Sequence, residues 1–455
     1  MNQSLRGFII LFYLIGLLDS FAQGQHELET INIIHNRKKS TQIGFLVLEQ
    51  DSLAFRKGFF TPLDKALFNM PSVNIRSYGS GNISGISVRG GSTSQTAVAW
   101  NGINLQSQFN GMGDLSMISN LDNHQIELQL GGSSGLVGSG AIAGTLFINS
   151  IPDFDSINQL NFSFQAYDFD QKSTQANYKL GNQTFQLTIS PYAQWGNNNY
   201  RYRLTQQNDQ VLRQKHGRIE WLGQHSGLTY KFNPKTTISI HSWVQDAERL
   251  VPNPSHLLST AQQKDFFSRN LMSVEHRFLS NLKSDVRIAH LQEKLVYEDL
   301  PKNLHSPFNF NQWLVENDWK LKIKNAHIII ASGHLSQSIG RNVNHRNGAN
   351  TRIRKATFLS YHFKPASGID FVTSTAIEQN NRLISPLSPS FGMNVKVYRG
   401  IFLKGNISKT YRMPTFNDLF WKDGGNENLN PETGLGKELG FEVNKTMGEF
   451  WHFKH

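Results

Sequence analysis

The N-terminal end of the chain places the strongest limit on its fold. Arg6 supplies a positive charge, residues 8–18 read FIILFYLIGLL, and small residues follow at Ser20 and Ala22. This order is typical of a secretory signal peptide and predicts cleavage after Ala22, with an uncleaved anchor as the alternative. The apolar run is shorter than the roughly 20 residues that a membrane-spanning helix needs. Because long apolar helices stop exported chains at the inner membrane, we expect any later membrane-spanning elements to be strands.

Composition agrees with a chain of many strands. Hydrophobic residues make up 38% of the 455 residues, and 31 Phe with 37 Gly suit strands, tight turns and rings of aromatics. Cysteine is absent, which excludes a disulfide framework and a thiolate metal site. The formal net charge of +11 suits an anionic lipid surface, an anionic ligand or nucleic acid. No compact Lys/Arg block with interleaved aromatics occurs, so we expect no nucleic-acid partner.

Residues 41–150 have the pattern of a small glycine-rich domain. Thr61 as the cap and Pro62 in the first helical position predict a short helix that runs through Leu67. Asn101-Gly102 predicts a two-residue turn. Three short strands are predicted between the glycines, at residues 83–88, 96–100 and 125–130.

Residues 131–144 hold six further glycines and invite comparison with a phosphate-binding loop. They lack the G-x-x-x-x-G-K-[ST] order that such a loop needs. We therefore interpret them as a tightly turning connection between strands.

The remainder of the chain alternates apolar and polar residues, which predicts strands with one apolar and one polar face. A soluble β-sandwich shows similar alternation. The clearest segments are residues 184–195, with Phe185, Leu187, Ile189, Ala193 and Trp195 on one face; residues 237–245, with Ile238, Ile240 and Val244; and residues 401–408, with Ile401, Leu403 and Ile407.

Two features favour a membrane barrel over a sandwich. Turn signals are tight at residues 181–182 and 233–234, whereas residues 196–216 and 336–351 read as long polar loops. This asymmetry is typical of barrels with short turns on one side of the membrane and long loops on the other. Aromatic residues near predicted strand ends suit an interfacial girdle, namely Tyr192, Trp195, Tyr200 and Tyr202.

Several segments of the glycine-rich domain carry a family resemblance. Residues 86–91 (ISVRGG), 98–105 (VAWNGINL), 126–128 (IEL) and 138–146 (GSGAIAGTL) resemble, in this order, the plug of TonB-dependent receptors. The chain departs from the family pattern at residues 130–132 and at Asn101, where Asp is usual. The motif positions are Arg89, Gly90, Asn101, Gly102, Gly138, Gly140 and Gly144.

The resemblance continues late in the chain. Residues 411–419 (YRMPTFNDL), 425–432 (GNENLNPE) and 438–442 (ELGFE) resemble a passage in the barrel of the same receptors. The matching segments lie near both ends of the expected mature chain. The resemblance therefore implies a mainly β fold, with an N-terminal α+β plug domain inside an antiparallel transmembrane β-barrel.

The domain order implied by the resemblance is a signal peptide at 1–22, a leader at 23–40, the plug at 41–150 and the barrel at 155–455. A β-prone run in the leader resembles the TonB box, the segment that pairs with the TonB energy transducer of the inner membrane. A structureless tether is the alternative interpretation of this run. The candidate box residues are Glu29, Thr30, Ile31, Asn32 and Ile33.

Energy-coupled import across the outer membrane is the function that the resemblance implies, with outer-membrane lipid and a small nutrient as further partners. Residues 23–40 are too few to fold as the extra domain that saccharide importers carry. Residues 415–425 (TFNDLFWKDGG) lack the His that haem receptors place there. An iron-siderophore or a corrinoid is therefore the expected ligand.

A passive porin or adhesin, or a barrel-borne enzyme, are the alternatives. The plug-like domain argues against an open porin. An enzyme would need a Ser/His/Asp or carboxylate constellation, and we identify none in the sequence. We expect no catalytic residue, no cofactor and no metal site. His334 and His345 are predicted to lie in a solvated outer loop, Asp246–Arg249 at a charged loop tip, and Trp421 at the rim.

Length predicts an incomplete barrel. A plugged barrel of about 22 strands, with roughly 20 residues for each strand and its connection, needs on the order of 440 residues. Residues 155–455 supply about fifteen such strands by the same arithmetic, and His455 departs from the usual terminal aromatic. We therefore expect a truncated or frame-disrupted receptor that neither inserts stably nor transports, with a smaller closed barrel as the alternative.

Overall fold

The computed structural model describes residues 42–49, 62–68, 70–77, 79, 81–119, 124–204, 210–252, 260–324, 326–447 and 451–454. The predicted signal peptide, the leader and its candidate TonB box lie outside these residues. All of the described residues fall within one compact unit. No helix in the described ranges has both the length and the apolar character needed to cross a membrane.

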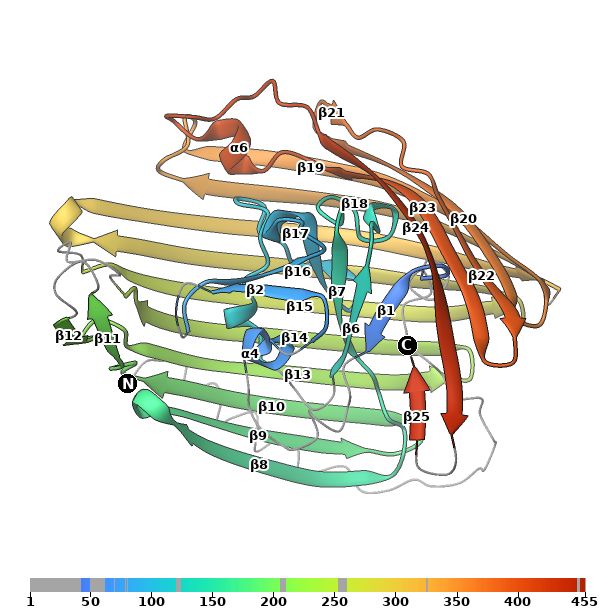
Figure 1. Cartoon of the computed structure of the whole chain (residues 1–455), viewed down its shortest axis with the longest axis horizontal. Helices are drawn as coiled ribbons and strands as arrows, with labels where there is room; N and C mark the ends of the chain where they lie inside the picture. The colour runs from blue at the N-terminus through green and yellow to red at the C-terminus, as the bar shows by residue number, and fades with distance from the viewer. Residues whose placement is uncertain are drawn as a thin grey trace. The chain divides into compact units, whose positions relative to one another are not determined.

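The glycine-rich domain folds around a mixed five-stranded sheet in the order β1-β6-β7-β4-β5 (Figure 1). The pair β4–β7 is parallel, and the other neighbours are antiparallel. A separate hairpin, β2–β3, lies beside this sheet. The strands are β1 (Leu46–Glu49), β2 (Val73–Ser77), β3 (Ser84–Val88), β4 (Thr96–Trp100), β5 (Ile103–Asn104), β6 (His124–Leu130) and β7 (Gly144–Ser150). We call this domain the plug.

Short helices complete the plug and differ in detail from the prediction. The predicted helix is α4 (Leu63–Leu67), and Pro62 is its N-cap residue rather than its first helical residue. The glycine-rich connection at 131–144 contains one helical turn, α5 (Ser134–Val137), between β6 and β7, as expected of a strand connection. Two 3₁₀ turns, η2 (Thr93–Gln95) and η3 (Leu115–Met117), precede β4 and β6.

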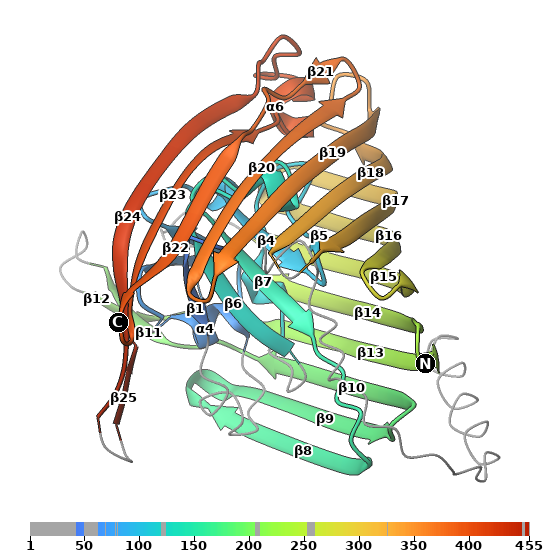
Figure 2. The same cartoon turned by 90° about the vertical axis from the view of Figure 1, so that its right-hand side faces the viewer.

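A second, larger sheet has sixteen strands and is antiparallel throughout its described pairs (Figures 1 and 2). Its order follows the chain from β8 to β25, with β8 and β25 at the two ends and β21 paired to β20. We call this sheet the wall. Its strands are β8 (Ile157–Tyr167), β9 (Gln171–Gly181), β10 (Phe185–Gly196), β13 (Ile219–Asn233), β14 (Thr236–Leu250), β15 (Gln262–Leu279), β16 (Leu282–Asp299), β17 (Leu304–Ile323), β18 (His327–Asn342), β19 (Ala349–Ala366), β20 (Ile369–Asn380), β21 (Leu383–Ile384), β22 (Ser390–Tyr398), β23 (Ile401–Arg412), β24 (Glu432–Met447) and β25 (Trp451–Lys454).

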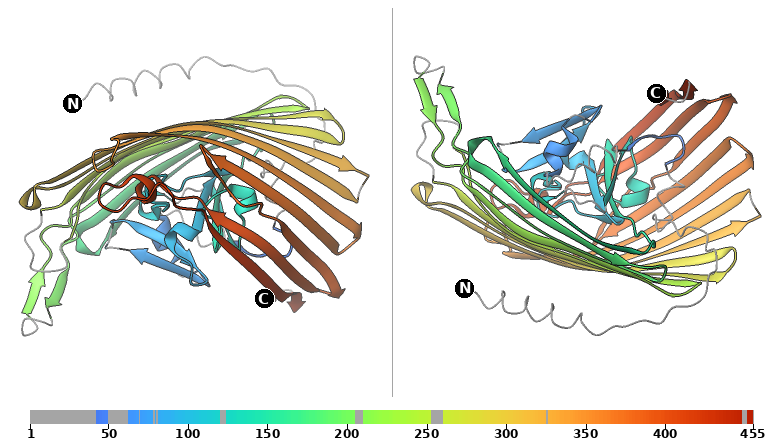
Figure 3. Two further views of the ribbon diagram at one scale, coloured as in Figure 1. Left: turned by 90° about the horizontal axis from the view of Figure 1, so that it is seen from above. Right: turned by 90° about the horizontal axis from the view of Figure 1, so that it is seen from below.

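The wall curves around the plug, which lies on its concave side (Figure 3). Connections at one edge of the wall are tight, as at residues 234–235, 280–281 and 367–368. Connections at the other edge are longer, and residues 413–431 include the helix α6 (Phe416–Phe420). We call these the turn edge and the loop edge. The predicted asymmetry of short turns and long loops is therefore confirmed.

Both predicted long loops are wrong in extent. Residues 336–351 are mostly strand, because β18 runs to Asn342 and β19 starts at Ala349. Their polar side chains misled the prediction, since Ser336 and Ser338 are buried against the plug side of the wall rather than solvated. The segment 196–216 contains a hairpin of its own, β11 (Arg201–Leu204) and β12 (Gln210–Arg213). The 3₁₀ turns η4 (Asp168–Asp170) and η5 (Leu300–Lys302) also lie at the loop edge.

The predicted alternation within the strands is confirmed. In β10, Gln186, Thr188 and Ser190 are buried, whereas their apolar neighbours are more exposed on the convex face. Polar side chains thus face the plug, the arrangement expected of a barrel whose lumen is polar. Tyr192 is an exception to the predicted girdle: it is 2% exposed and faces the plug. Its hydroxyl donates to Gln245 and accepts from Trp243.

The observed fold confirms the predicted class, mainly β with an α+β plug and a large antiparallel sheet. An apolar core joins the two parts, because plug residues such as Leu128 and Trp100 pack in one cluster with Trp243 and Phe310 of the wall. The residues at which the leader, plug and barrel begin and end remain predictions.

Candidate functional site: the plug–wall interface

The plug and the wall enclose a small polar cavity of about 50 Å³. Plug residues 102–111 and 137–140 form one side, and strands β17 to β20 and β23 form the other. The side chains that matter chemically are Gln106 and Gln108 of the plug and Glu316, His334, Arg352, Arg354 and Glu378 of the wall.

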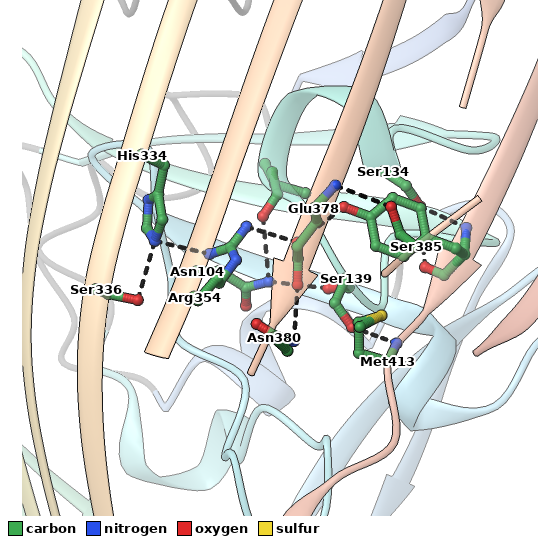
Figure 4. Close-up of polar contacts among 12 residues, drawn as sticks. Asn104, Ser134, Ser139, His334, Ser336, Arg354, Glu378, Asn380, Ser385 and Met413 are labelled. Atoms are coloured by element: carbon green, nitrogen blue, oxygen red, sulfur yellow. Dashed lines mark hydrogen bonds and ion pairs between the residues drawn. The ribbon is translucent and has the colours of Figure 1, made fainter. Parts of the chain in front are cut away.

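Glu378 of β20 is the buried centre of the polar contacts around this cavity (Figure 4). Glu378 is 1% exposed. Its carboxylate accepts hydrogen bonds from Arg354 Nη2 at 3.0 Å and from the Tyr411 hydroxyl at 2.8 Å. Asn380 donates to the other carboxylate oxygen at 3.0 Å. A buried carboxylate is costly unless it is paired and hydrogen-bonded, and here three donors meet that requirement.

His334 belongs to the same group, so its predicted place in a solvated loop is wrong. It lies on β18 with its side chain 6% exposed. Its Nε2 lies 3.2 Å from Arg354 Nη1, and its Nδ1 lies 2.7 Å from a Glu316 oxygen. A guanidinium can only donate, so Nε2 accepts and Nδ1 carries the proton that it donates to Glu316. The imidazole therefore connects Arg354 to Glu316 in its neutral form.

A segment of the plug forms hydrogen bonds with the C-terminal end of β23. Ser134 Oγ accepts from the backbone N–H of Tyr411 at 3.1 Å, and the N–H of Gly140 donates to the Tyr411 carbonyl at 3.2 Å. The N–H of Met413 donates to Ser139 Oγ at 2.8 Å. The plug segment 134–140 therefore hydrogen-bonds to the edge of β23 beyond the end of its pairing with β22, while the other edge of β23 stays paired with β24.

The long connection after β23 rests on the plug. The N–H groups of Phe416 and Asn417, at the start of α6, donate to the carbonyls of Gln108 at 2.8 Å and Phe109 at 3.1 Å. Arg352 of β19 joins the same two segments, because it donates to Gln108 Oε1 at 3.0 Å and to the Pro414 carbonyl at 2.8 Å. The plug loop 107–111 and the connection 413–431 thus form one hydrogen-bonded layer.

His345 lies in this layer, and its predicted solvation is also wrong. The residue is 1% exposed, and its ring stacks on Phe109 with centroids 5.4 Å apart. Its Nε2 lies 2.9 Å from Asn417 Oδ1. Trp421 is 36% exposed, in agreement with a rim position, and its backbone forms a bridge with that of His345.

An ionic contact joins the plug to another part of the wall. Asp246–Arg249 belong to strand β14, so their predicted place at a loop tip is wrong. Arg249 is 1% exposed and pairs with Asp114 of the plug at 3.1 Å and with Asp265 of β15 at 3.0 Å. It also donates to Ser116 Oγ at 3.2 Å. The sequence contained one signal for this site. In the alternating pattern of the strand, Arg249 falls on the same face as Thr237 and Gln245, which is the face that points toward the plug.

The predicted motif residues of the plug occupy turns and close contacts. Arg89, which has φ 50°, forms an ion pair with Glu438 of β24, and Gly90 follows it with φ 75°. Asn101 and Gly102 have φ 47° and 86° and join β4 to β5, as the two-residue turn predicted. The Asn101 side chain accepts from the N–H of Ser150 at 2.7 Å. Gly144 lies where β7 passes so close to β6 that a Cβ would be 2.8 Å from the Gln129 carbonyl oxygen.

Three histidines form a cluster beside the buried Trp100 at another part of the interface. His225 and His241 of the wall lie 6.0 Å and 6.2 Å from it between ring centroids, and His124 of the plug lies 4.9 Å from His225. Burial, and then the neighbouring His241, lower the pKa of His124 to about 3. His124 is therefore neutral near pH 7, and the plug carries no positive charge at this contact.

Gly138 provides a test of how closely the plug must fit. It has φ 86° and ψ −151°, a backbone region that is essentially restricted to glycine, and a Cβ there would overlap the Arg354 guanidinium. We expect Gly138→Ala to weaken docking of segment 133–140 by about 1–3 kcal/mol. Hydrogen–deuterium exchange of that segment should rise accordingly. Gly135→Ala is the matched control, because its Cβ would lie at an ordinary 3.7 Å from Phe358; equal exchange in both variants would contradict the prediction.

The residues that the structure describes contain no group of three or more His, Cys, Asp or Glu side chains arranged to hold a metal ion. The site is a polar contact between two parts of one chain.

The comparisons with known proteins identify this arrangement. Residues 45–145 match the TonB-dependent receptor plug domain, and residues 118–453 match the TonB-dependent receptor-like β-barrel. The chain belongs to the TonB-dependent receptor family. This confirms the predicted resemblance and assigns the chain to the outer membrane.

One relative known by sequence is the vitamin B12 transporter BtuB of Vibrio vulnificus (strain YJ016). It is 23% identical to this chain over 393 residues, which are 84% of this chain and 61% of BtuB. The chain thus spans less than two thirds of the length of that relative.

Solved structures of similar fold are receptors and transporters of iron compounds. A mutant of the ferric enterobactin receptor PfeA from Pseudomonas aeruginosa has a TM-score of 0.72 and 13% identity, covering 90% of this chain and 70% of its own. The siderophore receptor PirA from Acinetobacter baumannii has a TM-score of 0.71 and 13% identity, and the match covers 90% of this chain and 70% of PirA. The FrpB iron transporter from Neisseria meningitidis has a TM-score of 0.70 and 11% identity, and the match covers 88% of this chain and 70% of FrpB. At these identities the likeness shows the fold alone.

Proposed function

We propose that the plug and wall of this chain belong to a receptor for energy-coupled uptake of a scarce nutrient, such as an iron-siderophore or a corrinoid, across the outer membrane. The observation that carries the proposal is that the plug lies within the wall and is held there by polar contacts. Arg249 with Asp114, and Ser134 with Tyr411, are examples. A nutrient can pass only if these contacts are released.

The character of the contacts suits reversible release. A hydrogen bond between protein groups contributes only about 0.5–1.5 kcal/mol net, because water replaces the partner when the contact opens. Polar contacts can therefore be exchanged for hydration one after another, whereas a purely apolar interface would lose its burial at once. The apolar cluster around Trp100 and Trp243 remains to hold the resting position.

The energy for release would come from the TonB transducer through the leader. The candidate box, Glu29 to Ile33, precedes the first described residue, Gln42, by fewer residues than a folded domain needs. A pull on the leader would thus act on β1, which pairs with β6 in the plug sheet. This is a transport role without covalent chemistry, so the chain is proposed not to be an enzyme.

The corrinoid and the siderophore are both retained as ligand classes, because the sequence relative is a vitamin B12 transporter and the structural relatives include siderophore receptors. Three arginines line the cavity, namely Arg352, Arg354 and Arg412. The alternative is a passive porin or an adhesin, which would need no energy source.

Energy dependence separates these functions. Cells that produce the protein would be given labelled vitamin B12 or ferric enterobactin, with and without a protonophore. We expect cell-surface binding of one of the two compounds in both conditions and its accumulation only with the proton gradient intact. Accumulation that continues at the same rate with the protonophore would favour a porin. Surface binding without accumulation in either condition would favour an adhesin.

A further inference from the structure

The hairpin β11–β12 projects from the loop edge of the wall, beyond the ends of β10 and β13 (Figures 1 and 3). Its register pairs Arg201 with Arg213 and Arg203 with Val211. Directly opposed residues of an antiparallel pair place their side chains on the same face. One face of the hairpin therefore carries three arginines around a single valine.

The two faces of the hairpin differ in exposure. Arg201, Arg203 and Arg213 are exposed, and Val211 on the same face is 53% exposed. Tyr202 and Leu212 on the other face are partly buried. Lys215, two residues after the hairpin, is exposed as well. We call the three arginines the basic face.

The basic face has no anionic partner among the residues that the structure describes. None of its arginines forms an ion pair there, whereas the nearby Arg218 pairs with Glu220 at 3.0 Å and with Glu248 at 3.1 Å. Like charges directly opposite each other on paired strands are destabilising. The hairpin thus maintains a repulsive pair, Arg201 and Arg213, that an external anion would relieve.

Aromatic side chains locate the hairpin relative to the membrane. Phe169 and Trp195 at the loop edge are 48% and 39% exposed. Tyr200 lies 5.8 Å from Phe169 and 6.3 Å from Tyr202 between ring centroids. Exposed aromatics near strand ends mark the level of the lipid headgroups in outer-membrane barrels. The basic face therefore lies at the height where headgroup phosphates are found.

From this juxtaposition we propose that the basic face of the β11–β12 hairpin binds the phosphate groups of anionic lipids in the outer leaflet. Guanidinium groups bind phosphate in a bidentate geometry. The opposed pair Arg201 and Arg213 has Cβ atoms about 5 Å apart, and Arg203 follows two residues along the strand, about 7 Å away. This spacing allows two guanidinium groups to share one phosphate while the third contacts a neighbour. The site is independent of the transported nutrient and would fix the loop edge of the wall in its leaflet.

The test compares two variants of the full chain in detergent micelles. One carries Arg201→Gln, Arg203→Gln and Arg213→Gln. The other carries Lys235→Gln, Lys322→Gln and Lys324→Gln, which remove the same charge from exposed positions at the turn edge. Binding of the bisphosphorylated glycolipid lipid A, of the same glycolipid without phosphates, and of inorganic phosphate would be measured by native mass spectrometry.

A basic residue at an anionic lipid surface contributes roughly a fivefold change in affinity, so three account for a change on the order of 100-fold. We expect the hairpin variant to bind lipid A on the order of 100-fold more weakly than the unmodified protein. The affinity of the turn-edge variant for lipid A should change less than twofold. The dephosphorylated lipid should bind neither variant. Equal losses in the two variants would overturn the proposal, since net charge alone would then explain binding. Inorganic phosphate that binds as tightly as lipid A would also overturn it, in favour of a soluble anion.

A second readout separates binding from folding. Arg213→Gln removes one member of the repulsive pair, so without lipid the hairpin should resist protease at least as well as in the unmodified protein. Added lipid A should protect the unmodified hairpin and leave the triple variant unprotected. Protection of the triple variant by lipid A would contradict the proposal.

Discussion

Replacing Arg249 by Met is expected to weaken the attachment of the plug to the wall by about 3–5 kcal/mol, the range found when one partner of a buried ion pair is removed. Met keeps much of the length of the side chain and removes its charge. Asp114 of the plug and Asp265 of the wall, which share the Arg249 guanidinium, would then face each other without a cation. Water must enter or the plug must shift, because an unpaired buried carboxylate is costly.

Arg218 supplies a matched control for this prediction. It also binds two carboxylates, at 3.0 Å and 3.1 Å, but its side chain is 46% exposed, against 2% for Arg249. Arg218→Met should therefore cost no more than about 1 kcal/mol. Hydrogen–deuterium exchange at β3 and η3, which lie near Asp114, should rise by a factor of about 100 or more in Arg249→Met and by less than about tenfold in Arg218→Met. Similar exchange in the two variants would show that burial does not decide the strength of this contact.

Replacing Ile31 by Pro is expected to abolish uptake and to leave binding of the nutrient at the cell surface unchanged. Extended segments such as a TonB box add to the edge of a partner's sheet through backbone hydrogen bonds, and proline removes the donor at its position. Ile31 is central in the candidate box, Glu29 to Ile33, which lies outside the residues that the structure describes. The measurement is accumulation of the labelled nutrient, with surface binding measured on the same cells.

Gln25→Pro is the control for Ile31→Pro, because it places proline in the same leader but outside the β-prone run. Uptake should be close to normal in this variant. Normal uptake in Ile31→Pro would dismiss the segment as the box and favour a structureless tether. Loss of surface binding in Ile31→Pro would instead indicate a defect in export or folding.

The fold was largely predictable because its signals are local. Successive side chains of a strand point to opposite faces, so the alternation in residues 184–195 and 237–245 indicated strands before any pairing was known. The turn at Asn101-Gly102 was predictable for the same reason, since only a few residue types tolerate two positive φ values in succession. The helix at Leu63–Leu67 was located correctly, although its first residue was misplaced by one position.

The polar segment 336–351 shows where this reasoning fails. Serine and asparagine side chains suit a solvated loop, and in an isolated sheet they would indicate one. In this chain the inner face of the wall meets the plug, so polar side chains such as Ser336 and Asn350 are buried within strands. His334 and His345 are buried for the same reason, because the plug rather than solvent lies against this side of the wall.

The sequence by itself determined the class of the protein, the succession of strands and the alternation of their faces, because each depends on residues within a few positions of one another. Only the tertiary structure decided which polar groups meet. Asp114 and Arg249 are 135 positions apart, and Ser134 and Tyr411 are 277 apart, yet each pair is in contact. No local pattern encodes such pairs, since an inward-facing arginine shows that it needs a partner but not which one. The plug supplies that partner only when the wall curves around it, and the contact between the two is the site on which the proposed transport depends.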